Sequence, residues 1–358
     1  MVTKAADTKK TPLWKRLLPT AITVGIVVYI FGWVLPQYID YEVVFREIGA
    51  IDAREWIILV VVASLRLLAR GWIYMTAQPG MTTKQGLSLY LVSNTMAMIP
   101  PGGLDLITRF QMCRGWGFGV AESTSATIGS YIFNTFSKLL LPLIAILLLD
   151  LRRIQDDDLD ALAVIGLVAA VVGGAVLFLV IRSPNLAERA GNLLGRIVRW
   201  VAGVFRREVA TDFRDLALQF REQNAELLRT RWHIGVATGV SAQVMGFLVL
   251  LLAIRFVGID QNTLDWVVVF AAFSAVAALT TIPIFKLPGI AEAIYIGVLN
   301  LVSGGGIADQ LVAAVFVFRI LTWLVPIPLG GIAFSRWRKE SKRLEDIDIL
   351  DSFEVTAD

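Results

Sequence analysis

Four basic side chains interrupt stretches of the sequence that are otherwise apolar. Arg66 and Arg70 lie four positions apart in ILVVVASLRLLARGWIYM, so they share one face of a helix. Lys138 interrupts FNTFSKLLLPL, and Arg319 interrupts VFVFRILTWLVP. An ionisable group inside a bilayer is costly and normally faces a cavity or a counter-ion. These positions therefore predict a polar site within a membrane protein.

Two further bases, Arg109 and Lys286, lie in segments rich in proline and glycine, close to the acids Asp105 and Glu292. With the four bases above, these positions hold six bases against two acids. Such a surplus of positive charge suits an anionic ligand. The predicted substrate-binding residues are Arg66, Arg70, Asp105, Arg109, Lys138, Lys286, Glu292 and Arg319.

Structural roles are an alternative for three of these bases. Arg70 and Lys138 have side chains long enough to extend to the membrane interface and leave only their stems in lipid. Arg319 lies deeper in its apolar stretch, and we expect it to pair with Glu292. That pair either locks two elements together or moves during function.

The segment MIPPGGLDLITR cannot continue as a regular helix. Pro100 and Pro101 lack an N–H donor and disfavour helical geometry in the residue before them, whereas Gly102 and Gly103 permit a sharp turn. Broken backbone inside a bilayer is tolerated only against protein or cavity water. We therefore predict a re-entrant hairpin over residues 85–120, with these four residues at its tip.

A second break, TTIPIFKLPGIAEAIYIGVLN, repeats this pattern near the other end of the chain. Pro283 interrupts the segment, and Pro288 with Gly289 interrupts it again. Half-helices that begin at such tips present free N–H groups to phosphate. We predict a second re-entrant hairpin over residues 264–304. The alternative is that each break ends a span in an ordinary loop.

The composition argues against most soluble enzyme classes. Of the 358 residues, 56% are hydrophobic and 18% are charged, which indicates a polytopic membrane protein. The single cysteine, Cys113, and the single histidine, His233, exclude an intramolecular disulfide and the usual multi-ligand zinc and iron sites. We expect no cofactor, no metal and no nucleic-acid partner.

Six apolar stretches are long enough to cross a membrane, for which a helix needs about 20 residues. The two predicted hairpins lie between the second and third stretches and between the fifth and sixth. The expected fold class is therefore an all-α polytopic membrane protein. The predicted spans cover residues 17–36, 55–77, 121–149, 158–181, 232–254 and 308–334.

Loop charges orient these spans, because Lys and Arg are enriched on the cytoplasmic side. The tails 1–16 and 336–358 both carry basic clusters, and residues 182–231 hold ten arginines against six acids. Residues 150–160 instead hold five acids against two arginines. We predict a protein of the cytoplasmic (inner) membrane with both termini in the cytoplasm.

These directions agree only if the two hairpins enter from opposite sides, which makes the second half an inverted repeat of the first. Many secondary transporters have this architecture, with the substrate at the repeat interface. The linker 185–231 is predicted to lie on the anionic inner leaflet as amphipathic helix, and the acidic end after Arg343 to be disordered. The predicted divisions are a tail (1–16), a first repeat (17–149), a second repeat (150–335) and a tail (336–358).

The acidic run DDDLD, residues 156–160, supports a rival hypothesis. Clustered carboxylates on the outer face suit a divalent metal or a sugar donor, which would make the chain a membrane glycosyltransferase. Short acidic loops are commonly just solvated, and this one also fits the charge rule for outer loops.

The chain resembles the lysylphosphatidylglycerol synthase transmembrane (flippase) domain family from about residue 50 to 335. One matching segment is SNTMAMIPPGGLDLITRFQMCRGWGFGVAESTSATI. Another is LPGIAEAIYIGVL followed by VFRILTWLVPIPLGGIAF, with Glu292 and Arg319 where the family pattern has them. The chain departs from that pattern at 286–291, where relatives often have a fuller proline–glycine–glycine run. It also departs at 137–138, where an acid–arginine pair is common.

The resemblance implies a lipid flippase rather than an enzyme, since the sequence lacks the aminoacyltransferase domain that is fused in some relatives. It implies two substrate classes, aminoacyl-phosphatidylglycerol and polyprenyl-phosphate-linked or other envelope glycolipids. The expected partners are a lipid with an anionic headgroup, anionic inner-leaflet lipids and a lipid-synthesising enzyme or glycosyltransferase; homo-oligomerisation stays open. A transporter of a small soluble anion is the remaining alternative.

Overall fold

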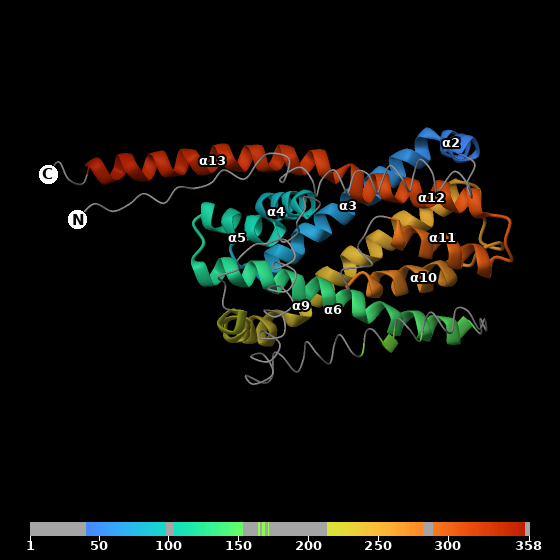
Figure 1. The fold of residues 1–358 in the computed structure, drawn as a ribbon, viewed down its shortest axis with the longest axis horizontal. Coiled ribbons are helices and arrows are strands. Elements are labelled where there is room, and N and C mark those ends of the chain that lie inside the picture. The colour runs from blue at the N-terminus through green and yellow to red at the C-terminus, as the bar shows by residue number, and fades with distance from the viewer. Residues whose placement is uncertain are drawn as a thin grey trace, which may run out of the picture.

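The regular structure of the described residues is entirely helical, in the computed structural model of the chain (Figure 1), which confirms the all-α class. The first and fourth predicted spans, 17–36 and 158–181, lie wholly or largely outside the described residues. The residues that the structure describes are 41–97, 104–152, 213–281 and 289–354, with a few between 164 and 171.

Four helical segments of the described part are long and apolar enough to cross a membrane. They coincide with the second, third, fifth and sixth predicted spans. The fourth segment is composite, because a short π-helical turn, η4, separates two α-helices. The segments are α3 (Ala53–Ala77), α6 (Val120–Arg152), α9 (Phe213–Phe256), and α12 (Ala308–Arg319) with η4 (Ile320–Leu324) and α13 (Pro326–Glu354).

Two helices continue beyond the spans that the sequence predicts. α9 begins at Phe213, so the last part of the predicted linker 185–231 is continuous with the fifth span. α13 runs to Glu354, where we expected disorder. Neither extension contains a proline or glycine to stop the helix. A short helix, α2 (Tyr41–Gly49), follows the first predicted span and packs against α12.

Two pairs of shorter helices flank the predicted breaks. α4 (Thr83–Met96) contacts α5 (Leu104–Gly115), and α10 (Trp266–Leu279) contacts α11 (Ile290–Val302). α4 and α10 have 14 residues each, or about 21 Å at 1.5 Å per residue. The hydrocarbon core is about 30 Å thick, so neither helix is long enough to cross it. Of the predicted tip residues, Pro100 to Gly103, Pro283 and Pro288 lie outside the described residues, whereas Gly289 is described.

The two helix pairs open toward opposite ends of the molecule (Figure 1). Lys84, at the start of α4, forms an ion pair with Glu340 on α13 at 3.3 Å, and α5 ends where α6 begins. At the far end of α6, the guanidinium of Arg152 lies 5.9 Å from the ring centre of Trp266, at the start of α10. Since α6 runs from one end to the other, the first pair opens at one end and the second pair at the other.

The turn between α9 and α10 is organised by Arg255. Its guanidinium donates to the carbonyls of Ile259, Asp260 and Leu264 at 2.7–3.0 Å. The backbone N–H of Thr263 donates to the Asp260 carboxylate at 2.7 Å, and this bond lowers the pKa of that carboxyl. These bonds fix the fifth span to the second helix pair.

α10 is buried on all sides. Every residue from Val267 to Ala278 is buried, and the helix contacts α6, α9 and α11. A helix that is apolar all round belongs in a protein interior or in lipid. The second helix pair is therefore part of the core that positions the site described below.

Glycines allow α6 and α9 to approach closely. Gly235 and Gly239 lie one turn apart on α9 and face Phe133 and Ser137 on α6. A Cβ atom on either glycine would overlap the facing side chain. Small residues spaced in this way are typical of helix contacts in membranes, where packing replaces the hydrophobic effect.

Replacing Gly239 with leucine is therefore expected to destabilise the protein. Overpacking of this kind costs about 1–3 kcal/mol, which we expect to appear as a lower melting temperature of the purified protein in detergent. The matched control is Gly297→Leu, because Gly297 is also helical but has nothing within 4 Å of its Cβ position. Equal melting temperatures for the two variants would contradict the close α6–α9 contact.

Candidate functional site

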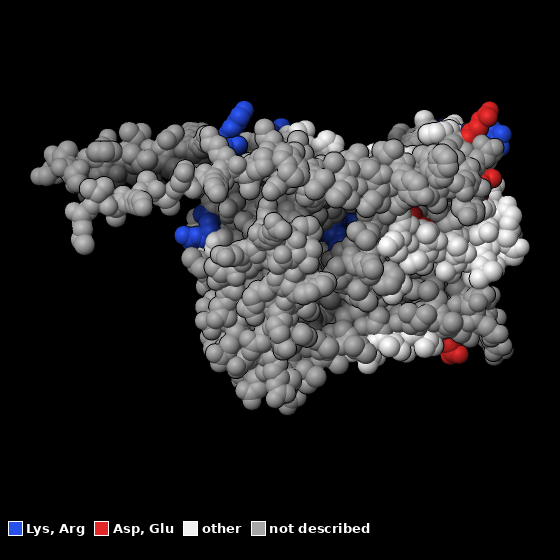
Figure 2. Space-filling model, in the orientation of Figure 1, with Lys and Arg blue, Asp and Glu red and all other residues white. Residues whose placement is uncertain are grey.

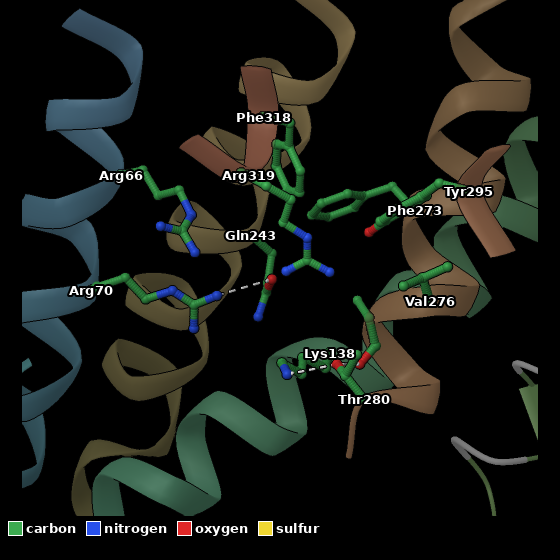
Figure 3. Close-up of a pocket in the computed structure, with 12 residues that line it drawn as sticks. Arg66, Arg70, Lys138, Gln243, Phe273, Val276, Thr280, Tyr295, Phe318 and Arg319 are labelled. Carbon is green, nitrogen blue, oxygen red and sulfur yellow. Dashed lines mark hydrogen bonds between the residues drawn. The ribbon is translucent and has the colours of Figure 1, made fainter. Parts of the chain in front are cut away.

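A cavity of about 100 Å³ lies between the spans and the second helix pair. Its walls come from α3, α6, α9, α10, α11 and α12 (Figure 3). Among the described residues, no acid lines it. Figure 2 shows basic atoms recessed in the middle of the visible face, away from both ends. The charged residues that line the cavity are Arg66, Arg70, Lys138 and Arg319.

Arg66 extends from α3 toward the sixth span. Its Nη1 donates to the Tyr90 hydroxyl at 3.5 Å and to the Thr322 carbonyl at 3.4 Å. Thr322 lies in η4, and π-helical turns of this kind are frequent at functional sites. Both acceptors are neutral, and no carboxylate of the described residues forms an ion pair with Arg66.

Arg70 lies one helical turn further along the same face of α3. It donates to the side-chain oxygen of Asn134 and, at 3.4 Å, to the side-chain oxygen of Gln243. Its Nε is buried and has no hydrogen-bond partner among the residues that the structure describes. Like Arg66, it has no carboxylate partner within the described part of the chain. The positive charges of both arginines therefore lack a counter-charge there.

Lys138 brings the third span to the second helix pair. Its Nζ donates to the Thr280 hydroxyl at 2.9 Å (Figure 3). Thr280 follows the last residue of α10. The Lys138 side chain therefore lines the cavity beside the end of α10, as Figure 3 shows.

Arg319 and Glu292 form the ion pair that the sequence analysis predicts. The Arg319 Nε lies 2.6 Å from Glu292 Oε1. The other carboxylate oxygen of Glu292 accepts from the backbone N–H of Gly289 at 2.9 Å. Gly289 has a φ of +94°, which favours glycine at this position. One carboxylate thus caps α11 at its start and ties it to the sixth span, directly before η4.

Asp105 and Arg109 form a separate cluster that does not line the cavity. They pair at 3.1 Å, four positions apart on α5 and therefore on one face of that helix. Arg109 also donates to the Ser93 hydroxyl and lies 5.4 Å from the ring centre of Tyr74. Tyr74 follows Arg70 by one turn of α3, so this cluster and the cavity lie along one helix. The first helix pair contributes only a neighbouring hydroxyl, that of Tyr90, to the bases of the cavity.

Several predicted site residues lie outside the described residues, so their arrangement stays a prediction. They include most of the predicted tip residues and one base. The residues concerned are Pro100, Pro101, Gly102, Gly103, Pro283, Lys286 and Pro288. The acidic run 156–160 of the rival hypothesis also lies outside the described residues.

Sequence reasoning missed two cavity residues on α9, Gln243 and Gly246. Gln243 is 2% exposed and accepts from Arg70. A Cβ on Gly246 would lie 3.3 Å from the Phe273 ring and 3.4 Å from Arg66 Nε, so the glycine leaves room in the cavity. The available signal was a lone amide in the apolar stretch QVMGFLVLLL, three positions before a glycine.

Comparisons with known proteins give one finding. The family model described as "Lysylphosphatidylglycerol synthase TM region" matches residues 20–330. No curated protein and no solved structure matches the chain.

Proposed function

We propose a function from one premise: the chain belongs to the lysylphosphatidylglycerol synthase TM-region family. It is accordingly a multi-pass membrane protein, and its four long apolar helices agree with that membership. The proposed function is translocation of a phosphate-bearing lipid across the cytoplasmic membrane. In this proposal the headgroup enters the cationic cavity while the hydrocarbon tails stay in lipid, and the protein moves the lipid without modifying it.

The observation that carries this proposal is the charge of the cavity. Four bases line it and no acid of the described residues does. Within the described part of the chain, two of them, Arg66 and Arg70, form hydrogen bonds to neutral groups only. Buried charges without a counter-charge are costly, and a protein has little reason to keep them together unless an anion binds there. A phosphate headgroup is an anion that the surrounding membrane supplies.

The arrangement of the helix pairs supports alternating access. The two pairs open toward opposite ends, and their helices are too short to cross the hydrocarbon core. Both features suit an inverted repeat with two re-entrant hairpins. The cavity lies at the second pair, and the link through Glu292 joins that pair to the sixth span. Movement of the second pair relative to the spans would therefore open and close the cavity.

Transport in liposomes tests the proposal. The purified protein is reconstituted into vesicles that carry a trace of labelled phospholipid or prenyl phosphate, and an impermeant reagent reports how much label becomes accessible on the outer leaflet. We expect accessibility to rise faster than in protein-free vesicles. If no phosphate-bearing lipid becomes accessible faster than in protein-free vesicles, the flippase is refuted. Uptake of soluble phosphate by the same vesicles would instead favour the small-anion transporter, for which the cavity is also suited.

The orientation proposed here, with the basic end in the cytoplasm, has its own test. Single cysteines at Asn262 and Lys84, both exposed, are placed in a chain whose Cys113 is replaced by serine. In sealed right-side-out vesicles, an impermeant maleimide is expected to label Asn262→Cys at once and Lys84→Cys only after the vesicles are opened. The reverse pattern would invert the topology, and labelling of both in sealed vesicles would refute the assignment of these ends to opposite sides.

A further inference from the structure

Three buried N–H groups of cavity residues have no hydrogen-bond partner among the described residues. One of them, Arg319 Nε, lies in the ion pair with Glu292, which leaves Arg70 Nε and Gln243 Nε2 without a partner of either kind. Gln243 is 2% exposed, so bulk water does not solvate its side chain. Buried polar groups are normally satisfied, and each exception needs an explanation. Both orphan groups here are donors, and both belong to residues that line the same cavity.

The orientation of the Gln243 amide follows from its neighbour. Arg70 has only donors, and its Nη2 lies 3.4 Å from the Gln243 oxygen. The amide nitrogen must therefore face away from Arg70. Figure 3 shows it directed into the space between Arg70, Lys138 and Arg319. The hydrogen bond from Arg70 to the Gln243 oxygen therefore fixes the direction of the amide nitrogen, and it leaves that nitrogen without a partner among the described residues.

Three side-chain acceptors at or beside the cavity, those of Gln243, Thr280 and Glu292, already have protein donors. Gln243 accepts from Arg70, and the Thr280 hydroxyl accepts from Lys138. Both oxygens of Glu292 are in use, one by Arg319 and one by the N–H of Gly289. An ammonium group needs acceptors and an opposite charge, whereas this cavity offers it donors and positive charge. Its chemistry suits a ligand that only accepts.

We propose that the cavity binds one phosphate group of a lipid that carries no positive charge, and that Gln243 is a specificity-determining residue for it. This inference rests on the proposed function and deepens it, because it selects between the two lipid classes that the family resemblance left open. Phosphate oxygens are acceptors only, and they satisfy Arg70 Nε and Gln243 Nε2 together. A lysyl or other aminoacyl headgroup would bring an ammonium group to four bases.

The cavity has room for a phosphate group. Its volume is about 100 Å³, which exceeds the space of a single water molecule several times. Gly246 keeps this space open, since a Cβ there would lie 3.4 Å from Arg66 Nε.

The test is a binding comparison between two lipids that differ by one lysyl group, which carries two amino groups. Dioctanoyl phosphatidylglycerol and its lysyl ester are titrated against the purified protein in detergent, with native mass spectrometry as the readout. We expect the anionic lipid to bind at least ten times more tightly. Equal affinity, or tighter binding of the lysyl ester, would overturn the proposal.

A variant then assigns the preference to Gln243. Gln243→Glu places a carboxylate among the bases. We expect it to weaken binding of the anionic lipid and to strengthen binding of the lysyl ester, so that the preference for the anionic lipid falls at least tenfold. The matched control is Gln310→Glu on α12, which adds the same charge at a residue that does not line the cavity. An unchanged preference in Gln243→Glu would remove Gln243 from the proposal. If that variant does not fold, the lipid pair on the unmodified protein still decides the ligand class.

Two further measurements separate this inference from the proposed function. Inorganic phosphate is added as a competitor, and competition at concentrations as low as those of the lipid would assign the site to a soluble anion and overturn the lipid ligand. The same lipid pair is then used for transport in liposomes. Selective binding without transport supports the ligand class and refutes the flippase. Equal transport of both lipids refutes the ligand class and leaves the flippase standing.

Discussion

Replacing Arg66 and Arg70 together with glutamine is expected to reduce lipid transport by about 100-fold or more. A hydrogen bond to a charged group contributes about 1.5–3 kcal/mol, and each 1.4 kcal/mol is a factor of ten. Loss of one such bond from each arginine to a phosphate therefore gives at least two orders of magnitude. The measurement is the transport rate in liposomes at low lipid substrate.

The folded protein is expected to tolerate this double substitution. Neither arginine has a carboxylate partner among the described residues, so the change leaves no such partner stranded and removes two close like charges. We expect the melting temperature to stay the same or to rise, as is common when a functional site is neutralised. If the double variant has a much lower melting temperature and its loss of transport follows from unfolding, the arginines stabilise the fold.

The matched control for the double variant is Lys84→Gln. It also replaces a base by an amide, but Lys84 is a surface residue whose side chain is 75% exposed. Its ion pair with Glu340 is of the exposed kind, which contributes about 0–1 kcal/mol. Transport by Lys84→Gln is expected to be close to that of the unmodified protein. A loss as large as in the double variant would point to a general effect of positive charge and away from the cavity.

Replacing Glu292 with glutamine is expected to abolish most transport by a different route. Glutamine keeps an oxygen that accepts from the N–H of Gly289, so the start of α11 stays capped. It loses the charge that pairs with Arg319 at 2.6 Å. The link between the second helix pair and the sixth span is then weakened, while an uncompensated Arg319 remains beside the cavity. We expect transport to fall at least about tenfold, in proportion to a loss of about 1.4 kcal/mol or more.

Comparison with Glu292→Ala separates the two roles of this carboxylate. Alanine removes the cap as well as the charge, and the loss of a helix cap costs about 1 kcal/mol. We expect a lower melting temperature for the alanine variant than for the glutamine variant, with equally poor transport. If glutamine restores transport, the cap is what matters and the ion pair is dispensable. If both variants fail to fold, the pair is structural.

Much of the helical layout could be predicted from the sequence, because its causes are local. Apolar runs of about 20 residues form helices of spanning length, and four such segments are present in the described residues. Proline and glycine act on their own backbone, so the two breaks between short helices could be predicted from MIPPGG and KLPG. The pairing of Asp105 with Arg109 is local as well, since residues four apart share a helix face.

The pairing of Glu292 with Arg319 was predictable for a different reason. They are the acid and the base that remain in neighbouring apolar segments, and a buried charge needs a partner. Because the apolar segments contain few charged residues, the pair could be identified by elimination without knowledge of the geometry. The same reasoning did not separate Arg109 from the cavity bases, because the number of charges does not tell how far apart they lie.

Only the tertiary structure decided which residues make the cavity. Gln243 meets Arg70, which is 173 positions away, and Thr280 meets Lys138, which is 142 positions away. No local pattern encodes such contacts, because they depend on how the helices pack. Gly246 is one of several glycines in the sequence, and only the approach of Phe273 and Arg66 gives it a role. The sequence by itself determined that positive charge lies in the membrane; packing decided that four of the bases surround one small cavity.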